Sequence, residues 1–213
     1  MKRFLATSPR QKVTGDLIYE PVECEYLRYD KPNCFPILCV MNACLEAGDE
    51  AELIVITAKD DSGTLDKDGN PADYWCGLNF DLLSREAAAL ACEKGASLKT
   101  TRLEIPFRET TSSHLDNFRR LIRLFHTDDQ VYADVTYGSK PGLMPLWIAL
   151  NFAQKNVDDL SVETIVYGLR LHGTDRQELY DVTRLFIMDQ IVSQLGAMNT
   201  ADPAAVIEKL LAL

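Results

Sequence analysis

The sequence predicts an α/β fold in which a doubly wound, mostly parallel sheet carries helices on both faces. Segments with the apolar spacing of strands alternate with helical segments about five times, a pattern typical of successive βαβ units. Residues 51–58, AELIVITA, form a continuous apolar run, which indicates a strand covered on both faces. The chain has 213 residues, enough to bury roughly 70% of its unfolded surface, so a core is expected without disulfides.

Four further segments complete the first half of this alternation, with a loop between two of them. Residues 3–7 have the composition of a short buried strand, and residues 97–106 alternate as a strand does. Residues 36–48 and 80–95 have helical apolar spacing, and each segment ends at a glycine, which is a usual C-cap. Residues 59–75 are polar and rich in turn formers, so they predict a long exposed loop.

The second half continues the alternation and ends in two helices. Serines at the start of 112–127 offer an N-cap for an amphipathic helix. Pro141 fits the first turn of a helix at 141–156, where its missing N–H costs nothing, and Pro145 is expected to kink that helix or shift its start. The remaining elements are predicted as strands at 131–136 and 162–171 and as helices at 183–197 and 202–213.

Composition narrows the classes of function. The formal net charge of −10 argues against a general nucleic-acid binder, and so against DNA as a partner. A small anion remains compatible with this charge, because backbone N–H groups and one or two cations can form a local pocket. The sequence has no apolar segment as long as a membrane span and no signal-peptide pattern at its start. We therefore expect a soluble cytoplasmic protein that has no membrane partner.

The cysteines and the acidic loop do not indicate a metal site. None of the six cysteines forms a CxxC pair, and Cys39 and Cys44 fall within a helical apolar pattern. We expect buried free thiols rather than zinc ligands or disulfides. The loop at 59–75, which includes Asp61 and Asp66, lacks the downstream glutamate of an EF-hand, so a solvated loop is expected rather than a calcium site.

Several polar residues gather where the strand at 131–136 meets the next helix. Thr136 and Ser139 offer hydroxyls, and Lys140 offers an ammonium. Gly138 allows positive φ or a close approach of the backbone to a ligand. A helix N-terminus follows, where free N–H groups and the helix dipole favour an anion. Turn formation and capping also favour glycine and serine here, so composition leaves both interpretations open.

A second loop with hydroxyls and cations follows the first strand and contains Ser8, Arg10 and Lys12. Ligands of doubly wound sheets bind at the carboxyl ends of strands, so two such loops at neighbouring strand ends would form a phosphate cradle. The segment DVTYGSK is neither a P-loop nor a GxGxxG fingerprint, so nucleoside triphosphates and dinucleotides gain no direct support. Asp134 either contributes to function or orients backbone amides in the turn.

Four stretches of the chain match the motifs of one known family in order and spacing. YADVTYGSKPGLMPLWIAL is similar to an Asp-x-Thr-x-Gly-x-(Lys/Arg) strand-to-helix motif, and TIVYGLRL is similar to a late Tyr-Gly strand. LYDVTRLFIMDQI resembles an Asp-x-Thr element that opens the following helix, and RFLATSPR matches the first strand. Together they resemble the CRISPR-associated Rossmann fold family, usually called CARF. The resemblance implies a Rossmann-like domain at 1–182 and a helical extension at 183–213 packed on the same domain.

The resemblance also implies a function. CARF proteins are homodimers that bind cyclic oligoadenylates, the second messengers of type III CRISPR immunity; cyclic tetra-adenylate is favoured here. A CARF unit without an effector domain is typical of a ring nuclease. Such an enzyme needs no metal or other cofactor, because a ribose 2′-OH attacks the adjacent phosphodiester and leaves a 2′,3′-cyclic phosphate. The implied catalytic residues are Lys140 and Ser8. The implied ligand-binding residues are Thr7, Ser8, Arg10, Thr136, Tyr137, Gly138, Ser139, Lys140 and Arg170.

The aromatic and histidine side chains near these motifs allow further expectations. Tyr137 is expected to stack on an adenine or to pack in the dimer interface. His114 and His126 are expected to face away from the strand ends, whereas His172 follows a strand and could approach a ligand. Some branches of the family carry His-Gly-Phe-Arg or Gly-Gly-x-Lys where this chain has Tyr-Gly-Ser-Lys, which leaves ring size and cleavage open.

Three hypotheses remain from the sequence. The first is a ring nuclease, and the second is a CARF sensor that holds the ring intact and passes the signal to a partner or effector domain. The third is a Rossmann-like enzyme that acts on a nucleoside or sugar phosphate. Only the first predicts cleavage of the ring, and only the third predicts tight binding of a mononucleotide with no preference for a cyclic oligomer.

Overall fold

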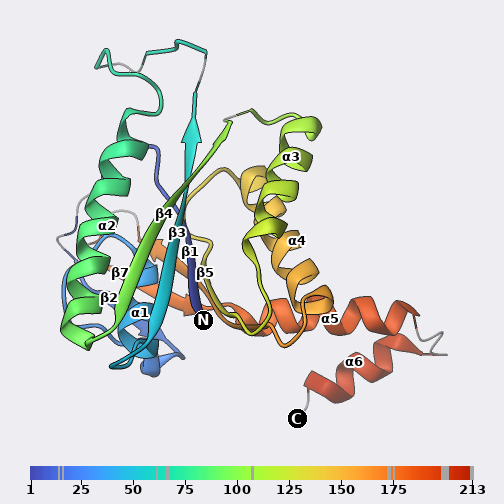
Figure 1. Ribbon diagram of the computed structural model, residues 1–213. Helices are drawn as coiled ribbons and strands as arrows, with labels where there is room; N and C mark the ends of the chain where they lie inside the picture. The colour runs from blue at the N-terminus through green and yellow to red at the C-terminus, as the bar shows by residue number, and fades with distance from the viewer. Residues whose placement is uncertain are drawn as a thin grey trace.

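A seven-stranded sheet forms the centre of the molecule, as a computed structural model shows (Figure 1). Its strand order is β2-β7-β6-β5-β1-β3-β4, and every neighbouring pair is parallel except β6 and β7. The α/β class predicted from the sequence is therefore confirmed. The strands are β1 (Lys2–Thr7), β2 (Tyr19–Val22), β3 (Glu50–Lys59), β4 (Ser97–Pro106), β5 (Gln130–Asp134), β6 (Ser161–Arg170) and β7 (Gln177–Asp181). The structure describes residues 1–13, 15, 17–60, 62–65, 68–106, 108–171, 174, 176–197 and 202–211.

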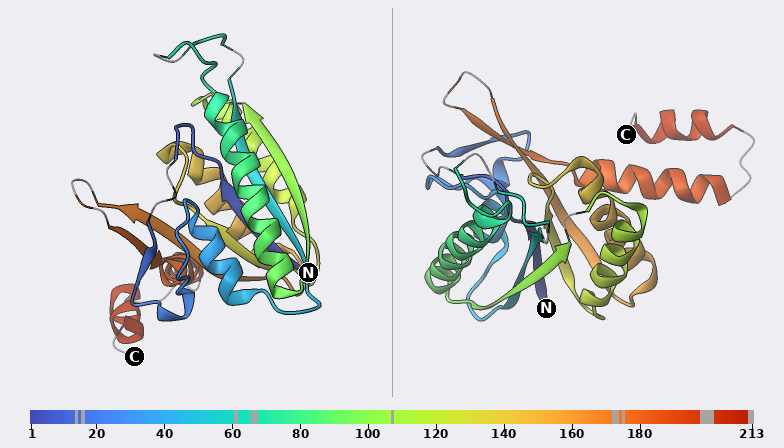
Figure 2. Two further views of the ribbon diagram at one scale, coloured as in Figure 1. Left: turned by 90° about the vertical axis from the view of Figure 1, so that its left-hand side faces the viewer. Right: turned by 90° about the horizontal axis from the view of Figure 1, so that it is seen from above.

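Helices cover both faces of the sheet, with α1 and α2 on one side and α3, α4 and α5 on the other (Figure 1, Figure 2). Neighbouring residues of β1 point to opposite faces, as side chains in a strand must. Phe4 stacks on Tyr132 in the cluster under α1 and α2, whereas Leu5 packs with Leu146 of α4 and Phe186 of α5. The helices are α1 (Pro36–Cys44), α2 (Tyr74–Lys94), α3 (Thr111–Leu121), α4 (Lys140–Asn156), α5 (Thr183–Ala197) and α6 (Pro203–Leu211).

The strand order reverses between β1 and β5. After β1 the chain first forms the edge strand β2, and it then passes through α1 to β3 and through α2 to β4 over one face of the sheet. From β4 it returns through α3 to β5 on the other side of β1, over the opposite face. Ligands of open α/β sheets bind outside the carboxyl ends of the strands at such a reversal. The loops at 8–12 and 135–139 leave β1 and β5 at this place.

Two short strands, β2 and β7, are missing from the sequence prediction. The four residues of β2 include Pro21, which is tolerated because β2 lies at the edge of the sheet. The five residues of β7, QELYD, pair antiparallel with β6. Periodicity does not reveal such strands, because a few mostly polar residues give no clear alternation.

The helices lie where the sequence places them, with different ends. α1 stops at Cys44, before the predicted cap at Gly48. α2 begins earlier than predicted, at Tyr74, and ends at Gly95 with φ 72° as expected. The N-cap of α3 is Thr110 rather than one of the serines that follow it.

The two C-terminal helices differ in how they attach. α5 packs on the sheet through Phe186, which is 1% exposed and lies in the same apolar cluster as α4 side chains. α6 runs beside α5 (Figure 1). Among the residues whose burial is described, α5 contributes a side chain to the buried core clusters and α6 does not.

The cysteines follow the sequence expectation in part. None of the six forms a disulfide, and the buried ones are Cys24, Cys34, Cys39 and Cys76. Cys44 is half-buried and Cys92 is exposed on α2, so the expectation of buried thiols is wrong for Cys92. Within the described ranges, no helix has the length and apolar character needed to cross a bilayer.

A buried ion-pair network holds the amino end of β1, at the other end of the strand from the loop at 8–12. The Arg3 guanidinium, whose side chain is 2% exposed, donates to Glu52 at 2.5 Å and to Asp129 at 2.7 Å. A buried charge is tolerated only when it is paired and hydrogen-bonded. This arrangement explains the buried charges at that end as structural.

Candidate functional site

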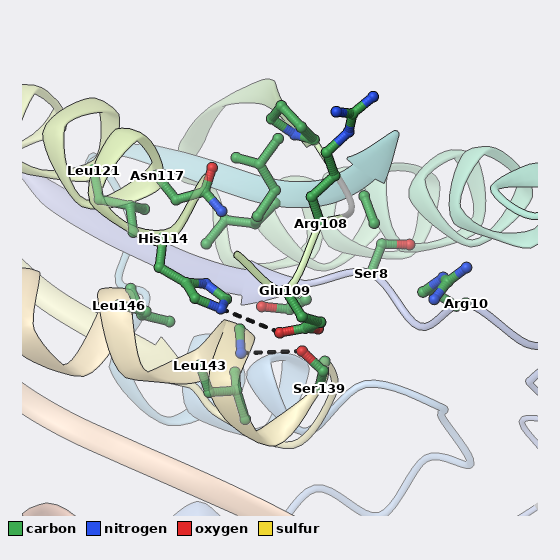
Figure 3. A pocket seen from close by; sticks show the side chains of 17 residues that line it. Ser8, Arg10, Arg108, Glu109, His114, Asn117, Leu121, Ser139, Leu143 and Leu146 are labelled. Carbon is green, nitrogen blue, oxygen red and sulfur yellow. Dashed lines mark hydrogen bonds and ion pairs between the residues drawn. The ribbon is translucent and has the colours of Figure 1, made fainter. Parts of the chain in front are cut away.

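Two cavities meet at the carboxyl ends of β1 and β5. The outer cavity has an empty volume of about 820 Å³ and is lined by the loops that follow the two strands. The second cavity, called the inner cavity here, is lined by α3, α4 and the ends of β1, β3 and β4, and its empty volume is about 630 Å³ including open solvent (Figure 3). Arg10, Gly138 and Ser139 line both cavities, so the two share a boundary.

Residues 135–139 join β5 to α4 and are called the seam here. Its glycine has a positive φ and its serine caps the helix, as these residue types suggest. Gly138 has φ +121°, a conformation that side chains rarely adopt, and a Cβ there would lie 3.3 Å from Leu143. Ser139 is the N-cap of α4, and its Oγ accepts a hydrogen bond from the Gly142 N–H at 3.0 Å. The Ser139 hydroxyl hydrogen therefore points elsewhere and can be donated to a ligand.

The loop after β1 lies opposite this seam. Thr7, Ser8 and Arg10 line the inner cavity, as the predicted cradle requires. Arg10 is paired with Asp60, 3.8 Å away, so part of its charge is balanced within the protein. The buried Ser8 hydroxyl donates to the Cys76 carbonyl at 2.9 Å, so it can accept a hydrogen bond but has no free hydrogen to donate in this conformation.

Three other residues implied by the resemblance either line neither cavity or have a side chain that is already hydrogen-bonded within the protein. Lys140 is the first residue of α4 and is exposed, but it lines neither cavity as described. Arg170 ends β6 on the surface and also lines neither. Tyr137 lines the outer cavity, yet its hydroxyl donates to the Cys34 carbonyl at 2.6 Å and its ring meets Phe35 edge-on. Burial raises the pKa of Tyr137 to about 12.

The Asp-x-Thr pair of β5 holds the backbone together. Asp134 is 1% exposed, and its carboxylate accepts hydrogen bonds from the Thr136 N–H at 2.8 Å and the Ile37 N–H at 3.2 Å. Thr136 Oγ1 accepts in turn from the Gly168 N–H of β6 at 2.7 Å. Of the two roles that the sequence left open for Asp134, these contacts favour the orientation of backbone amides. They tie the seam to α1 and β6.

The same pair recurs at the end of β7. Asp181 accepts a hydrogen bond from the Thr183 N–H at 2.9 Å, and Thr183 Oγ1 accepts from the Ile165 N–H at 2.8 Å. This second Asp-x-Thr element therefore joins the start of α5 to β6. The two Asp-x-Thr motifs therefore each have a structural role in this fold, and that role does not require a ligand.

The pH dependence of stability should reveal the buried Asp134 carboxyl. Burial raises its pKa from an ordinary 3.8 to about 6, so between these values the folded state binds more protons than the unfolded state. The contribution of Asp134 to the free energy of unfolding should therefore fall as the pH rises through this window. Asp134→Asn removes this contribution. The free energy of unfolding of the wild type minus that of the variant should therefore decrease by roughly 2 kcal/mol between pH 4 and pH 7, as measured by urea titrations. A constant difference would contradict the raised pKa.

The expectation for His114 is wrong. His114 of α3 lines the inner cavity together with Ser8 and Ser139, rather than facing away from the strand ends (Figure 3). The reason is that α3 lies beside the carboxyl ends of the strands with Ser113 and Asn117 on its buried face, and His114 lies next to that face. His126 follows the helix, and its N–H donates to Asp129 at 2.8 Å, on the far edge.

Sequence reasoning also missed Arg108, Glu109 and Asn117, which line the same cavity. One signal was available for Asn117. It lies four residues before Leu121 and four after Ser113, on the face of α3 that is buried, so a polar amide occupies a core position. His172, Asp61 and Asp66 lie outside the described residues.

Comparison with known proteins adds no assignment. The sequence matches no protein-family model and no curated protein sequence.

Proposed function

We propose that this chain binds a cyclic oligoadenylate at the carboxyl edge of its sheet and cleaves it as a metal-independent ring nuclease of type III CRISPR defence, acting in the cytoplasm. The observation that carries the proposal is the pair of hydroxyl-and-cation loops facing each other where the strand order reverses. One of them runs directly into the N-terminus of the 17-residue helix α4. Free N–H groups and the dipole of such a helix favour a phosphate.

The residues at the seam suit phosphodiester cleavage by the ligand's own ribose. The 2′-oxygen attacks the adjacent phosphorus, the P–O5′ bond breaks, and the product carries a 2′,3′-cyclic phosphate. Charge develops on the non-bridging oxygens, and a positioned donor stabilises it. Ser139 can donate its hydroxyl hydrogen, and the next residue, Lys140, carries an exposed ammonium on the first turn of α4.

A homodimer would complete the site around a ring with two-fold symmetry. α4 carries an exposed apolar row that supports this proposal: Met144 is 62% exposed, Ile148 52% and Phe152 37%. These residues are four apart and so lie on one face of the helix. If the two-fold axis runs roughly along α4, so that the two helices lie parallel, an isologous contact on this row would bring the two copies of the seam together. Cyclic tetra-adenylate suits such a pair of sites.

A sensor that holds the ring without cutting it is the second candidate. The observation that favours it is the Ser8 hydroxyl, whose hydrogen is donated to the Cys76 carbonyl rather than to the cavity. A residue held in this way can help to bind a phosphate through its neighbours but gives less stabilisation to developing charge.

The test mixes the purified protein with cyclic tri-, tetra- or hexa-adenylate in EDTA and follows binding by calorimetry and products by chromatography. Linear products with 2′,3′-cyclic phosphate ends are expected. Tight binding of an intact ring would replace the nuclease with the sensor. Absence of binding to every ring would overturn both and favour an enzyme of small nucleotides or sugar phosphates.

A further inference from the structure

The inner cavity contains polar atoms that the phosphate chemistry does not use. Its walls are largely apolar, formed by Ile56, Ala58, Ile105, Leu121, Leu143 and Leu146. Gly138 and Ser139 of the seam also line it, so it adjoins the place of the proposed phosphate. Apolar walls with a few placed polar groups are typical of sites for small ligands rather than of solvent channels.

Asn117 is the first of these polar groups. It projects from α3 over the cavity (Figure 3), it is 3% exposed, and its Oδ1 has no hydrogen-bond partner among the described residues. A buried amide oxygen without a partner is destabilising, so the structure has a reason to keep it only if something else binds there. A carboxamide offers an acceptor and a donor side by side.

His114, one turn earlier on α3, is the second. Its Nε2 lies 3.2 Å from a carboxylate oxygen of Glu109, and its Nδ1 is buried with no partner among the residues described. When neutral imidazole donates its Nε2–H to the carboxylate, Nδ1 carries the lone pair. Glu109 thereby fixes the tautomer in which His114 is an acceptor at the cavity wall. Two unpartnered acceptors three residues apart on one helix suit a ligand group with two N–H bonds.

We propose that the inner cavity is a nucleobase pocket that selects a base with an exocyclic amino group, of the 6-aminopurine kind. Asn117 accepts from the amino group and donates to the neighbouring ring nitrogen, the pairing by which asparagine distinguishes adenine. His114 accepts the second amino hydrogen, and the apolar walls hold the ring. This inference rests on the proposed function only in placing the phosphate of the same nucleotide at the seam.

A comparison of three small probes tests the pocket on the unaltered protein. Calorimetry measures binding of AMP, of IMP, in which the amino group is replaced by an oxo group, and of ribose 5-phosphate, which has no base. AMP should bind about tenfold more tightly than IMP, because the oxo group of IMP has no hydrogen to donate to Asn117 Oδ1. Equal binding of AMP and IMP, equal binding of AMP and ribose 5-phosphate, or no binding of AMP at millimolar concentration would overturn the proposal.

Two variants test whether Asn117 and His114 produce the preference for AMP over IMP. Asn117→Leu should bring the AMP-to-IMP ratio close to one, and His114→Phe should lower it by a few-fold. Ser113→Ala is the matched control, since Ser113 is on the same helix and has an unpartnered hydroxyl but does not line the cavity. Folded variants that keep the full ratio would overturn the assignment.

The outcome is separable from that of the ring assay. Cyclic tetra-adenylate that binds without any AMP preference over IMP leaves the proposed function standing and removes the pocket. Selective AMP binding without binding of any ring leaves the pocket and removes the ring nuclease.

Discussion

Lys140→Ala should slow ring cleavage by roughly a hundredfold or more, the loss typical for removal of one group that stabilises developing charge. Lys140 is exposed at the first position of α4, directly after the N-cap Ser139, in the turn whose N–H groups have no partner within the helix. The side chain packs in neither core cluster, and its loss should leave the fold unchanged. Single-turnover cleavage of cyclic tetra-adenylate in EDTA measures the rate, and circular dichroism checks the fold.

The matched control for this change is Lys155→Ala. Lys155 has the same charge and exposure and lies in the last turn of the same helix, at the end away from the seam. Removal of either lysine changes the net charge equally, so a general electrostatic effect would slow both variants alike. Equal cleavage rates for the two variants would refute a catalytic role for Lys140. If the wild-type protein only holds the ring, the same pair should differ in affinity instead.

The parts of the fold that could be predicted are those with a strong local pattern. The β-branched run of 51–58 lies within β3, and the alternation of 97–106 matches β4, because both strands are long. The sequence predicted a doubly wound sheet with these loops at neighbouring strand ends, but the place of the reversal, between β1 and β5, comes from the structure. The short strands β2 and β7 could not be predicted in this way, because their few residues find their places only through pairing at the edge of the sheet.

The residues of the candidate site that lie in the seam could be predicted from the sequence, whereas those that α3 contributes could not. Gly138 and Ser139 act through their own loop, so a local reading of the sequence finds them. Asn117 and His114 depend on where α3 lies relative to the strand ends, and periodicity says only which face of a helix is apolar. Ser8 and Tyr137 were found, but the partners of their hydroxyls, the carbonyls of Cys76 and Cys34, belong to distant segments.

The largest expected loss of stability comes from Gly168→Ala. A Cβ at this position of β6 would lie 2.5 Å from Pro36 Cγ and 2.8 Å from Tyr19 Cε1. Both neighbours are ring atoms, Pro36 in the first turn of α1 and Tyr19 at 3% exposure, so neither moves away without a shift of backbone. Overpacking of this kind should cost about 3 kcal/mol, which would lower the melting temperature of a chain of this size by roughly 6–12 °C.

The consequence of this crowding should extend to the seam. The added methyl would also lie 3.3 Å from Thr136 Oγ1, the atom that accepts the Gly168 N–H, and would strain the contact that ties the seam to β6. Gly77→Ala is the control: no atom lies within 4 Å of its Cβ position in α2, and alanine in a helix should stabilise by up to about 1 kcal/mol. Calorimetric melting of the two variants should therefore move in opposite directions. A Gly168→Ala protein as stable as the wild type would mean that the close approach of β6, α1 and β2 is not a fixed feature of the fold.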